Sequence, residues 1–533
     1  MSILSPTPQW RMIPGHIHGL AQPALWGQIT VDLRPGAQLA ALEAFMRRVV
    51  PGAMTWPSVG IDECGVLEHV VFWIGELQRH ARIAISMRAF VALATQEPSR
   101  ALPTFDVALP VASHRAAASA LQWVLKAANA CLPRHRPPAA TLDALAAEAA
   151  ALLPQLKLAA ERGFNTYPLL LAAYRLDVPV RKLSGRIVRL GLGTHARMLE
   201  SSVSDTTSAL GVNLASDKWL TARLLRGVGL PGTVNDVAAD AERAVALAAT
   251  LGYPVVVKPA DQDQGRGVSA HLQNAQEVRD AFVIAAKASS RILVEKHVDG
   301  FGHRFTVHDG QVLAVLKRIA GGVTGDGQHT VTELLALQLQ QPRVQRSVSL
   351  GRVSLDAEAL ALLEGPQRGP HSVVAAGEFV LLRRRDSISA GGTNEHLSLD
   401  QVHPDNLALA VRAAKALYLD IAGVDILSPD IGRSWREHGA AICEVNARPQ
   451  FGPGAQGDNY ERMLTRLLGA SSRIPVHIVL CGNQHAPELL QALQALRRAV
   501  GAQAVVLRAG RVGPQASPYR RLARRNACCP RCP

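Results

Sequence analysis

The sequence is poor in several features, and each shortage excludes a class of protein. Aromatic residues make up 4% of the 533 residues, which argues against a surface that stacks nucleic-acid bases. No uninterrupted apolar run approaches the ~20 residues of a membrane helix, and the first twenty residues lack the basic start and apolar core of a signal peptide. The seven cysteines show no paired spacing before the last six residues, which favours a reducing cytoplasm over a disulfide framework. We therefore expect a cytoplasmic protein with no nucleic-acid and no membrane partner.

Acidic residues are missing from one part of the chain in particular. The formal net charge is +14, and residues 501–533 hold seven arginines and no Asp or Glu. This segment supplies half of the net positive charge, and its apolar residues show little periodicity. The sequence therefore predicts a flexible basic tail. The remainder is mildly basic, which suits a nucleotide or an acidic substrate equally well.

Lysine is scarce, so each lysine carries information. The chain contains nine lysines and forty-eight arginines. Lys258 closes the apolar run of "YPVVVKPADQDQGRGVSAHL", where a buried ammonium needs an anionic partner. Gly265 and Gly267 follow it and let backbone N–H groups approach a ligand closely. The pattern favours phosphate binding, although a strand followed by a mobile surface loop is the other interpretation.

Carboxylates interrupt three apolar strands further along the chain. Glu444 and Asn446 lie two residues apart in "ICEVNARP", so alternation puts them on one face of a strand. Asp425 of "GVDIL" is expected on a neighbouring strand. Three oxygen ligands of this kind suit Mg²⁺, and a solvated edge strand is the alternative. Glu295 ends the third of these apolar strands in "RILVEKHVDG", where backbone groups could hold an adenine edge or where the strand end is simply solvated.

The rest of the chain alternates helical and extended patterns, which is typical of an α/β (α+β) fold. An amphipathic helix is predicted over residues 67–86, in which Glu68 and His69 are interpreted as surface or core residues. Ser216 is the predicted N-cap of a helix over residues 217–229. Asp309-Gly310 predicts a tight hairpin between two strands.

Read together, these segments resemble the ATP-grasp superfamily and, within it, the cyanophycin synthetase family. The motifs that carry the resemblance are "GRIVRLGLGTHARMLESSVSDTTSALGVNLASDKWLTARLLRGVGLP", "VVVKPADQDQGRGV", "ILVEKHVDGFGHRFTV", "TGDGQHTVTELL", "QVHPDNLAL", "LDIAGVDIL" and "EVNARP". The resemblance covers roughly residues 160–475 and extends weakly into the N-terminal region through "LEHVVFWIGELQ". It implies a family-like N-terminal α/β domain over residues 1–160 and an ATP-grasp domain over residues 161–475.

The resemblance also implies a chemistry and a set of residues. The γ-phosphate of ATP would pass to a carboxylate, and an amine would attack the resulting acyl phosphate to form an amide, a reaction that depends on positioning and charge neutralisation. The implied residues are Lys218 and Lys258 for the phosphates; Gln264, Gly265, Arg266 and Gly267 for a lid; Glu295 with the backbone from Lys296 to Val298 for adenine; Asp425, Glu444 and Asn446 for Mg²⁺; and Arg304, Arg318 and Arg383 for substrate carboxylates and transition-state charge.

Several positions depart from the family pattern. The loop after Asn446 reads "RPQFGPG", with Arg448 and Gln450 where the family has a glycine-rich turn and a histidine, and Ser387 replaces an asparagine. "QPRVQ" is a reduced form of another family element. These departures leave open which amino acid and which carboxylate or peptide acceptor would be used.

The end of the chain departs most strongly. In the family, a second ATP-using domain of the Mur ligase type follows, with a Gly-Thr-Asn-Gly-Lys-Thr phosphate loop. The corresponding stretch "IPVHIVLCGNQHAPELL" keeps Gly482 and Asn483 without the Lys-Thr pair, and a phosphate loop without its lysine loses a point charge. Residues 476–533 are therefore expected to be a truncated remnant, and the cysteines of "CCPRCP" are expected in a frayed tail rather than in a metal site.

Three functions remain open from the sequence. The first is an ATP-dependent ligase similar to the aspartate-adding half of cyanophycin synthetase. The second is a different ATP-grasp ligase that joins amino acids in a small peptide or a specialised metabolite. The third is a non-catalytic remnant that partners a full-length synthetase. Whether the chain forms a homo-oligomer or works with such a synthetase is equally open.

Overall fold

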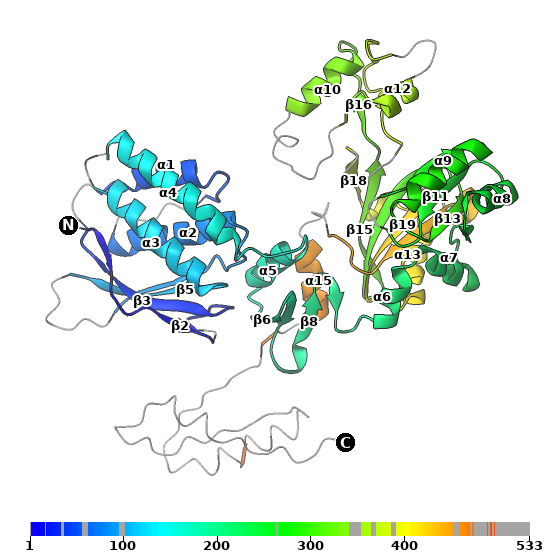
Figure 1. Ribbon diagram of the computed structural model, residues 1–533. Helices are drawn as coiled ribbons and strands as arrows, with labels where there is room; N and C mark the ends of the chain where they lie inside the picture. Colours follow the sequence, from blue (N-terminus) through cyan, green and yellow to red (C-terminus); the bar gives the residue numbers. More distant parts are fainter. Residues whose placement is uncertain are drawn as a thin grey trace. The chain divides into compact units, whose positions relative to one another are not determined.

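The fold is described from a computed structural model of the chain (Figure 1). The description covers residues 2–473 except 16, 34–36, 56–61, 95–101, 134, 136, 263–264, 341–352, 364–368, 385–390, 452–458 and 470–471, and beyond 473 it covers 488, 491–492 and 495. The chain divides into two compact units, Met1–Ile474 and Pro475–Pro533. Gln264, Ser387, "QPRVQ", Gly482, Asn483 and the cysteines of "CCPRCP" lie outside the described residues.

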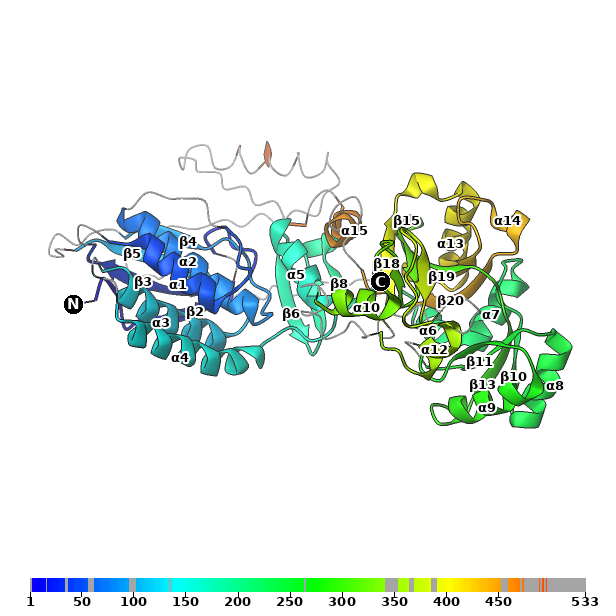
Figure 2. The ribbon, with the colours of Figure 1, turned by 90° about the horizontal axis from the view of Figure 1, so that it is seen from above.

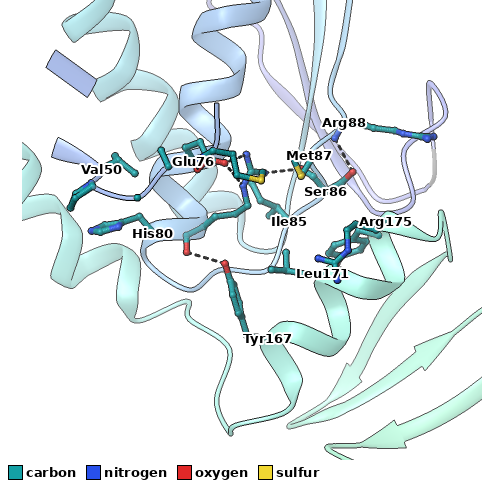
Figure 3. Close-up of a pocket in the computed structure, with 16 residues that line it drawn as sticks. Val50, Glu76, His80, Ile85, Ser86, Met87, Arg88, Tyr167, Leu171 and Arg175 are labelled. Atoms are coloured by element: carbon teal, nitrogen blue, oxygen red, sulfur yellow. Dashed lines mark hydrogen bonds and ion pairs between the residues drawn. The ribbon is translucent and has the colours of Figure 1, made fainter. Parts of the chain in front are cut away.

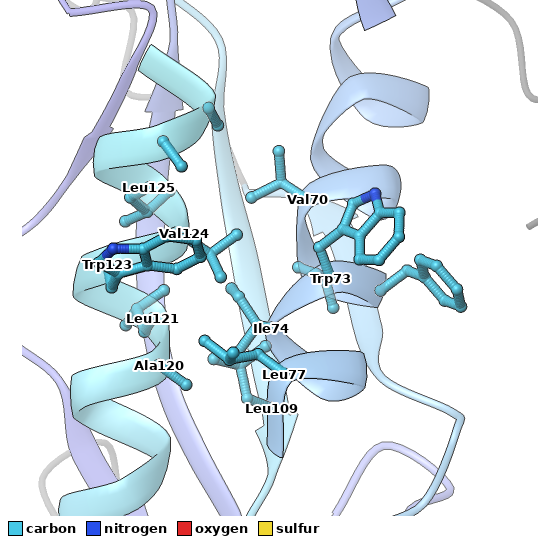
Figure 4. Packing of buried hydrophobic residues seen from close by; sticks show 14 of the residues in the cluster. Val70, Trp73, Ile74, Leu77, Leu109, Ala120, Leu121, Trp123, Val124 and Leu125 are labelled. Carbon is cyan, nitrogen blue, oxygen red and sulfur yellow. The ribbon is translucent and has the colours of Figure 1, made fainter. Parts of the chain in front are cut away.

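The N-terminal part of the first unit is an antiparallel sheet with helices packed on it (Figures 1 and 2). Its elements are β1 (Leu4–Pro6), β2 (Arg11–Ile13), β3 (Ala24–Val31), α1 (Leu39–Val49), α2 (Glu63–His80), β4 (Phe90–Leu93), β5 (Thr104–Pro110), α3 (His114–Cys131) and α4 (Ala139–Lys157). Trp73 and Leu77 of α2 meet Val124 of α3 and Leu109 of β5 in a fully buried core (Figure 4). This core is separate from those of the later sheets.

Helix α2 differs from the helix that the sequence predicts. It begins four residues earlier, because the Asp62 side chain accepts a hydrogen bond from Gly65 N at 2.7 Å and caps it, and it ends at His80 rather than continuing to residue 86. Almost every residue from 65 to 78 is buried, so the predicted amphipathic pattern is wrong. His69 is a buried core residue whose Nε2 accepts a hydrogen bond from Trp73 Nε1 at 3.1 Å.

A small antiparallel sheet follows, in the strand order β6-β7-β8-β9. Its elements are α5 (Thr166–Arg175), β6 (Val180–Ser184), β7 (Ile187–Leu190), the 3₁₀ turn η1 (Gly193–His195), β8 (Arg197–Glu200) and β9 (Val203–Ser204). Helix α15 (Asn459–Leu468), which comes much later in the sequence, packs against α5 and shares a core with this sheet.

Two larger sheets carry most of the predicted site residues. The first has the strand order β10-β13-β11-β12, and the second has the order β18-β15-β14-β19-β20. The elements of this region are α6 (Ala209–Ala215), α7 (Lys218–Gly227), β10 (Asn235–Ala238), α8 (Ala241–Leu251), β11 (Val255–Pro259), β12 (Ser269–Leu272), α9 (Ala275–Ala286), β13 (Ile292–Lys296), β14 (Phe301–His308), β15 (Gln311–Ile319), β18 (Thr393–Leu397), η3 (Leu399–Gln401), α13 (Pro404–Ala416), β19 (Ile421–Ser428), α14 (Trp435–His438) and β20 (Ala441–Asn446). Helix α13 packs on β14, β15 and β19.

Two local predictions in this region have clear outcomes. The Asp309-Gly310 hairpin is confirmed, because His308 pairs with Gln311 and both turn residues have positive φ angles, 46° and 68°. The predicted N-cap is wrong by one residue: Asp217 accepts hydrogen bonds from the backbone N–H groups of residues 219 and 220, both at 3.0 Å, and caps α7. Ser216 ends helix α6 instead.

An insertion between β15 and β18 forms a separate small core. It contains β16 (Gly322–Thr324), α10 (Val331–Gln340), α12 (Ala357–Leu363) and β17 (Phe379–Leu381). β17 lies within the strand that the sequence predicts over residues 378–385.

Candidate active site

Five of the predicted residues lie on one face of the five-stranded sheet. Asp425 of β19 is directly opposite Arg304 of β14 on one side and Glu444 of β20 on the other. Asn446 is two residues beyond Glu444, and Arg318 is two residues beyond the partner of Arg304 on β15. Residues that face each other across antiparallel strands share a face, as do residues two apart. The predicted neighbourhood of Asp425 and Glu444 is therefore confirmed as a strand pairing.

Asp425 is the centre of this face and is held by two guanidinium groups. Arg304 binds both carboxylate oxygens, with Nη2 at 2.7 Å from Oδ2, and Arg318 Nη2 lies 3.1 Å from the same oxygen. Burial alone would raise the pKa of Asp425, which is 5% exposed, but the charges of the two arginines outweigh it and lower that pKa. Asp425 is thus a permanent carboxylate that positions both arginines.

Lys218 joins the two larger sheets. It is the first residue of α7, and its Nζ donates to the backbone oxygen of Gln262, in the loop after β11, at 2.6 Å. The same Nζ lies 3.6 Å from Glu444 Oε2 on β20. A single cation therefore connects the glycine-containing loop with the predicted metal-binding strand.

The donor set on β20 fits a hard divalent cation. β20 is the edge strand of its sheet, as the alternative interpretation predicts, but helix α7 packs against it. The Glu444 side chain is 23% exposed, and its only ion pair among the described residues is the 3.6 Å contact with Lys218. Asn446 Nδ2 is buried without a hydrogen-bond partner in the part of the chain that the structure describes, so the amide is free to turn its oxygen toward a cation. Glu444 and Asn446 fit Mg²⁺ better than Asp425, whose oxygens are both bound by arginine.

Lys258 forms a buried ion pair in the four-stranded sheet. Its Nζ donates to Glu295 Oε1 at 2.7 Å, and the other carboxylate oxygen accepts from Thr233 Oγ1 at 2.6 Å and from Asn235 Nδ2 at 3.1 Å. Burial would lower the pKa of Lys258, but the charge and hydrogen bond of Glu295 outweigh it, so that pKa is raised. The Glu295 carboxylate thus holds Lys258, a role that the sequence analysis did not predict.

The other predicted nucleotide-binding residues belong to the same sheet or to its loops. Lys296 directs its Nζ to the backbone oxygens of Gly252 and Tyr253, at 2.8 and 3.3 Å, and Val298 follows the end of β13. In the predicted lid, Gly265 and Gly267 both have φ angles of 71°, which favour glycine. Arg266 between them is exposed.

Arg383 is held by a different set of partners. Its guanidinium binds both oxygens of Asp356, at 3.0 and 2.8 Å, and the backbone oxygen of Ser354 at 3.2 Å. These residues belong to the insertion. Among the described residues, no hydrogen bond or ion pair brings Arg383 together with Arg304 or Arg318, so its predicted role in carboxylate binding stays a prediction.

The sequence analysis missed Asn165, which organises the loop after β20. This buried side chain donates from Nδ2 to the backbone oxygen of Pro449 at 2.9 Å and accepts from Phe451 N at 3.2 Å and Tyr460 OH at 3.0 Å. Arg448 and Gln450 flank the clamped proline and are exposed. An asparagine just before a helix reads as an N-cap, so the sequence offers no signal for a clamp on a loop 284 residues away.

A cavity of about 480 Å³ lies elsewhere, between α2 and α5 (Figure 3). Val50, Ile85 and Leu171 supply much of its apolar lining, and Tyr167 at its edge donates to the backbone oxygen of Arg79 at 3.1 Å. None of the predicted site residues lines it. The charged face around Asp425, not this cavity, has the groups that phosphoryl transfer needs.

His303, next to Arg304 on β14, makes stability depend on pH. Burial and the neighbouring charge of Lys317 lower the pKa of His303 to about 4, against the opposing effect of backbone hydrogen bonds. An unfolded histidine titrates near 6.5, so the stability contribution is complete above that pH and is lost as the pH falls toward 4. The loss amounts to about 2 kcal/mol at a pH of about 5.

Replacing His303 by phenylalanine tests this pH dependence. The urea midpoint of wild type should fall more steeply than that of His303→Phe between about pH 7.5 and about pH 5, because only wild type has a buried group that resists protonation. Parallel curves for the two proteins over this range would show that His303 is not the group responsible.

Comparison with known proteins agrees with this geometry. The family model described as the carbamoyl-phosphate synthase L chain, ATP binding domain, matches residues 217–310, which include Lys218, Lys258 and Glu295. Cyanophycin synthetase from Trichormus variabilis is 32% identical over 459 residues, which are 85% of this chain and 47% of that protein. The chain is a homologue of the cyanophycin synthetases and contains an ATP-grasp domain.

Other similarities are more distant. The glutathione biosynthesis bifunctional protein GshAB from Mannheimia succiniciproducens is 29% identical over 295 residues, 52% of this chain and 38% of that protein. The crystal structure of a bifunctional glutathione synthetase from Pasteurella multocida covers 84% of this chain and 81% of that chain at 17% identity, with a TM-score of 0.45. The chain spans about half the length of the cyanophycin synthetase that it matches over 85% of its own length.

Two features are absent from the part of the chain that the structure describes. No helix among them is both long and apolar enough to span a membrane. No group of three His, Cys, Asp or Glu side chains among them could hold a metal ion. The predicted magnesium set contains an amide, Asn446, in place of a third such residue.

Proposed function

We propose that this ATP-grasp homologue is a carboxylate–amine ligase that works through an acyl phosphate. The observation that carries the proposal is the position of Lys218, whose Nζ contacts both the loop after β11 and Glu444. Phosphoryl transfer requires cations around the phosphates and oxygen ligands for a metal beside them. Lys218 contacts one group of each kind: the loop proposed to lie at the phosphates and the carboxylate proposed to bind the metal.

The proposed reaction has two steps. The γ-phosphorus of ATP is attacked by a carboxylate oxygen, the bond to the ADP oxygen breaks, and an acyl phosphate forms. An amine then attacks the acyl carbon, inorganic phosphate leaves, and the amine loses a proton to solvent. Lys218 and Lys258 would neutralise the phosphates, and Arg318, whose side chain is 29% exposed, is better placed than Arg304 to bind the substrate carboxylate in a bidentate manner.

Magnesium is proposed at Glu444 and Asn446, the two positions that fit it. When bound, it would neutralise charge on the phosphate oxygens. Asp425 would contribute indirectly, because it fixes Arg304 and Arg318 beside the same strand. Gly265, Arg266 and Gly267 are proposed as part of a lid that excludes water from the acyl phosphate.

The substrates are proposed from the relatives. The name cyanophycin synthetase leads us to propose that the chain adds aspartate to a peptide acceptor. The test supplies ATP, Mg²⁺, aspartate, arginine and a short aspartate–arginine primer and identifies the products by mass. Gain of one kind of amino acid together with phosphate release supports the proposal, whereas gain of both kinds would show a broader site than we propose.

Nucleotide binding gives a separate prediction. Saturating Mg·ATP should raise the thermal unfolding midpoint, because a ligand at 100 times its Kd adds about 2.7 kcal/mol of stability. Lys258→Ala should reduce this shift, whereas Lys182→Ala should keep it, since Lys182 pairs with Glu161 on the sheet β6–β9. A midpoint that Mg·ATP leaves unchanged in wild type would contradict the proposed function.

A further inference from the structure

The sheet β6–β9 has one face in a core and one face exposed. The core face carries Val180, Val188, Leu190 and Leu199. Strand alternation puts Arg181, Arg189 and Met198 on the other face, in one line across β6, β7 and β8. Ile187 and Met198 on this face are 40% and 45% exposed, so a basic and partly apolar surface is presented outward.

Two arginines oppose each other directly on this surface. Arg181 of β6 is the cross-strand partner of Arg189 of β7, and like charges directly opposite destabilise a sheet. Neither forms an ion pair with a described residue. Arg189 Nε is shielded from solvent and lacks a hydrogen-bond partner among the residues that the structure describes. A shielded guanidinium N–H without an acceptor is costly, so Arg189 lacks an acidic partner among the described residues.

The nearest carboxylate on this face is already shared. Glu200 pairs with Arg186 at 3.1 Å and with Arg448 at 3.6 Å. Arg448 follows β20 by two residues, beside the loop that Asn165 clamps. Two arginines thus share this one glutamate, and through Arg448 the surface continues to the segment just after Glu444 and Asn446.

Residues 474–533 offer little acid to complete this surface. Residues 474–533 contain a single acidic side chain, Glu488, and nine arginines from position 497 onward. The planar guanidinium group of arginine binds a carboxylate through two hydrogen bonds. The exposed Ile187 and Met198 side chains suit contact with the carbon atoms of a peptide better than contact with a phosphate backbone. Charge complementarity therefore identifies an acidic peptide as the occupant.

We propose that the outer face of β6–β8, built from Arg181, Arg189 and Met198 and continued by Arg448, binds an acidic peptide chain. This surface is distinct from the groups that would hold ATP. A peptide seated on it lies next to the loop after β20. The two opposed arginines are retained because the peptide carboxylates, rather than this chain, neutralise them.

The test is fluorescence anisotropy with a fluorescein-labelled hexa-aspartate peptide and the full chain in the absence of nucleotide. The variant Arg181→Gln/Arg189→Gln should weaken binding at least about tenfold, the loss of one charged hydrogen bond or more. The control Arg433→Gln/Arg436→Gln removes two exposed charges around α14 and should change binding by less than about twofold. The first variant should unfold at the same temperature as wild type or a higher one, because it relieves opposed like charges.

Several results would overturn the proposal. They are absence of peptide binding, equal losses in both double variants, and binding of a charge-matched oligothymidylate as tight as that of the peptide. If the double variant does not fold, the single variant Arg181→Gln, which alters an exposed side chain, carries the same test. Peptide binding without a thermal shift by Mg·ATP would refute the proposed ligase function and leave this surface standing.

Discussion

Lys258→Met is expected to lower the free energy of unfolding by about 3–5 kcal/mol. The Lys258 and Glu295 side chains are only 9% and 5% exposed, so removing the lysine leaves an anion in the interior. Thr233 and Asn235 still donate to that anion but cannot neutralise its charge. Thermal and urea unfolding, followed with and without Mg·ATP, measure the loss.

Two further variants separate pairing from burial. Lys258→Met/Glu295→Leu removes both charges and should recover most of the stability, because an apolar pair in place of a buried ion pair is often neutral. Lys126→Met breaks a pair with Glu148 whose side chains are 59% and 44% exposed, and it should cost less than about 1 kcal/mol. If Lys258→Met costs no more than Lys126→Met, the ion pair is not buried as described.

For site residues within one strand or beside one turn, the sequence predicts which side chains share a face, because side chains alternate along a strand. Strand alternation alone places Glu444 and Asn446 on one face, and the Asp309-Gly310 turn alone fixes the register of β14 with β15. That register places Arg304 opposite Leu316, whereas the position of Arg304 opposite Asp425 comes from the separate pairing of β14 with β19, which the turn does not set. The scarcity of lysine likewise singled out Lys218 and Lys258, because the sequence uses arginine at nearly every other cationic position.

Side-chain partners across long separations were not predictable. Glu295 and Lys258 are 37 residues apart, and nothing local indicates that the acid binds the lysine rather than lying at a nucleobase. The Asn165 clamp and the Arg383–Asp356 pair depend in the same way on how loops return to the sheets. The N-cap of α7 was predicted one residue too early. Ser216 and Asp217 both suit an N-cap position, but Ser216 is already used at the end of α6, so Asp217 caps α7.

Glu444→Gln is expected to reduce turnover about 10²–10³-fold, the typical cost of losing one well-placed electrostatic stabiliser. The substitution keeps the shape of the side chain but removes the negative charge that would bind Mg²⁺ beside Asn446. The affinity for ATP should fall by a smaller factor, because Lys218 and Lys258 remain. ATP-dependent phosphate release at saturating substrate and the Mg·ATP thermal shift measure the two effects separately.

The contact between Glu444 and Lys218 offers a competing explanation that this experiment can separate. If Glu444 acts only by orienting the Lys218 ammonium 3.6 Å away, Glu444→Gln should weaken ATP binding and turnover by the same factor. If it binds the metal, turnover should fall further, and extra Mg²⁺ should restore part of it. Glu437→Gln is the matched control, because Glu437 pairs with Arg433 on an exposed helix and should leave both quantities unchanged. Near-full turnover in Glu444→Gln would mean that β20 does not carry the metal site and that the proposed catalytic face is wrong.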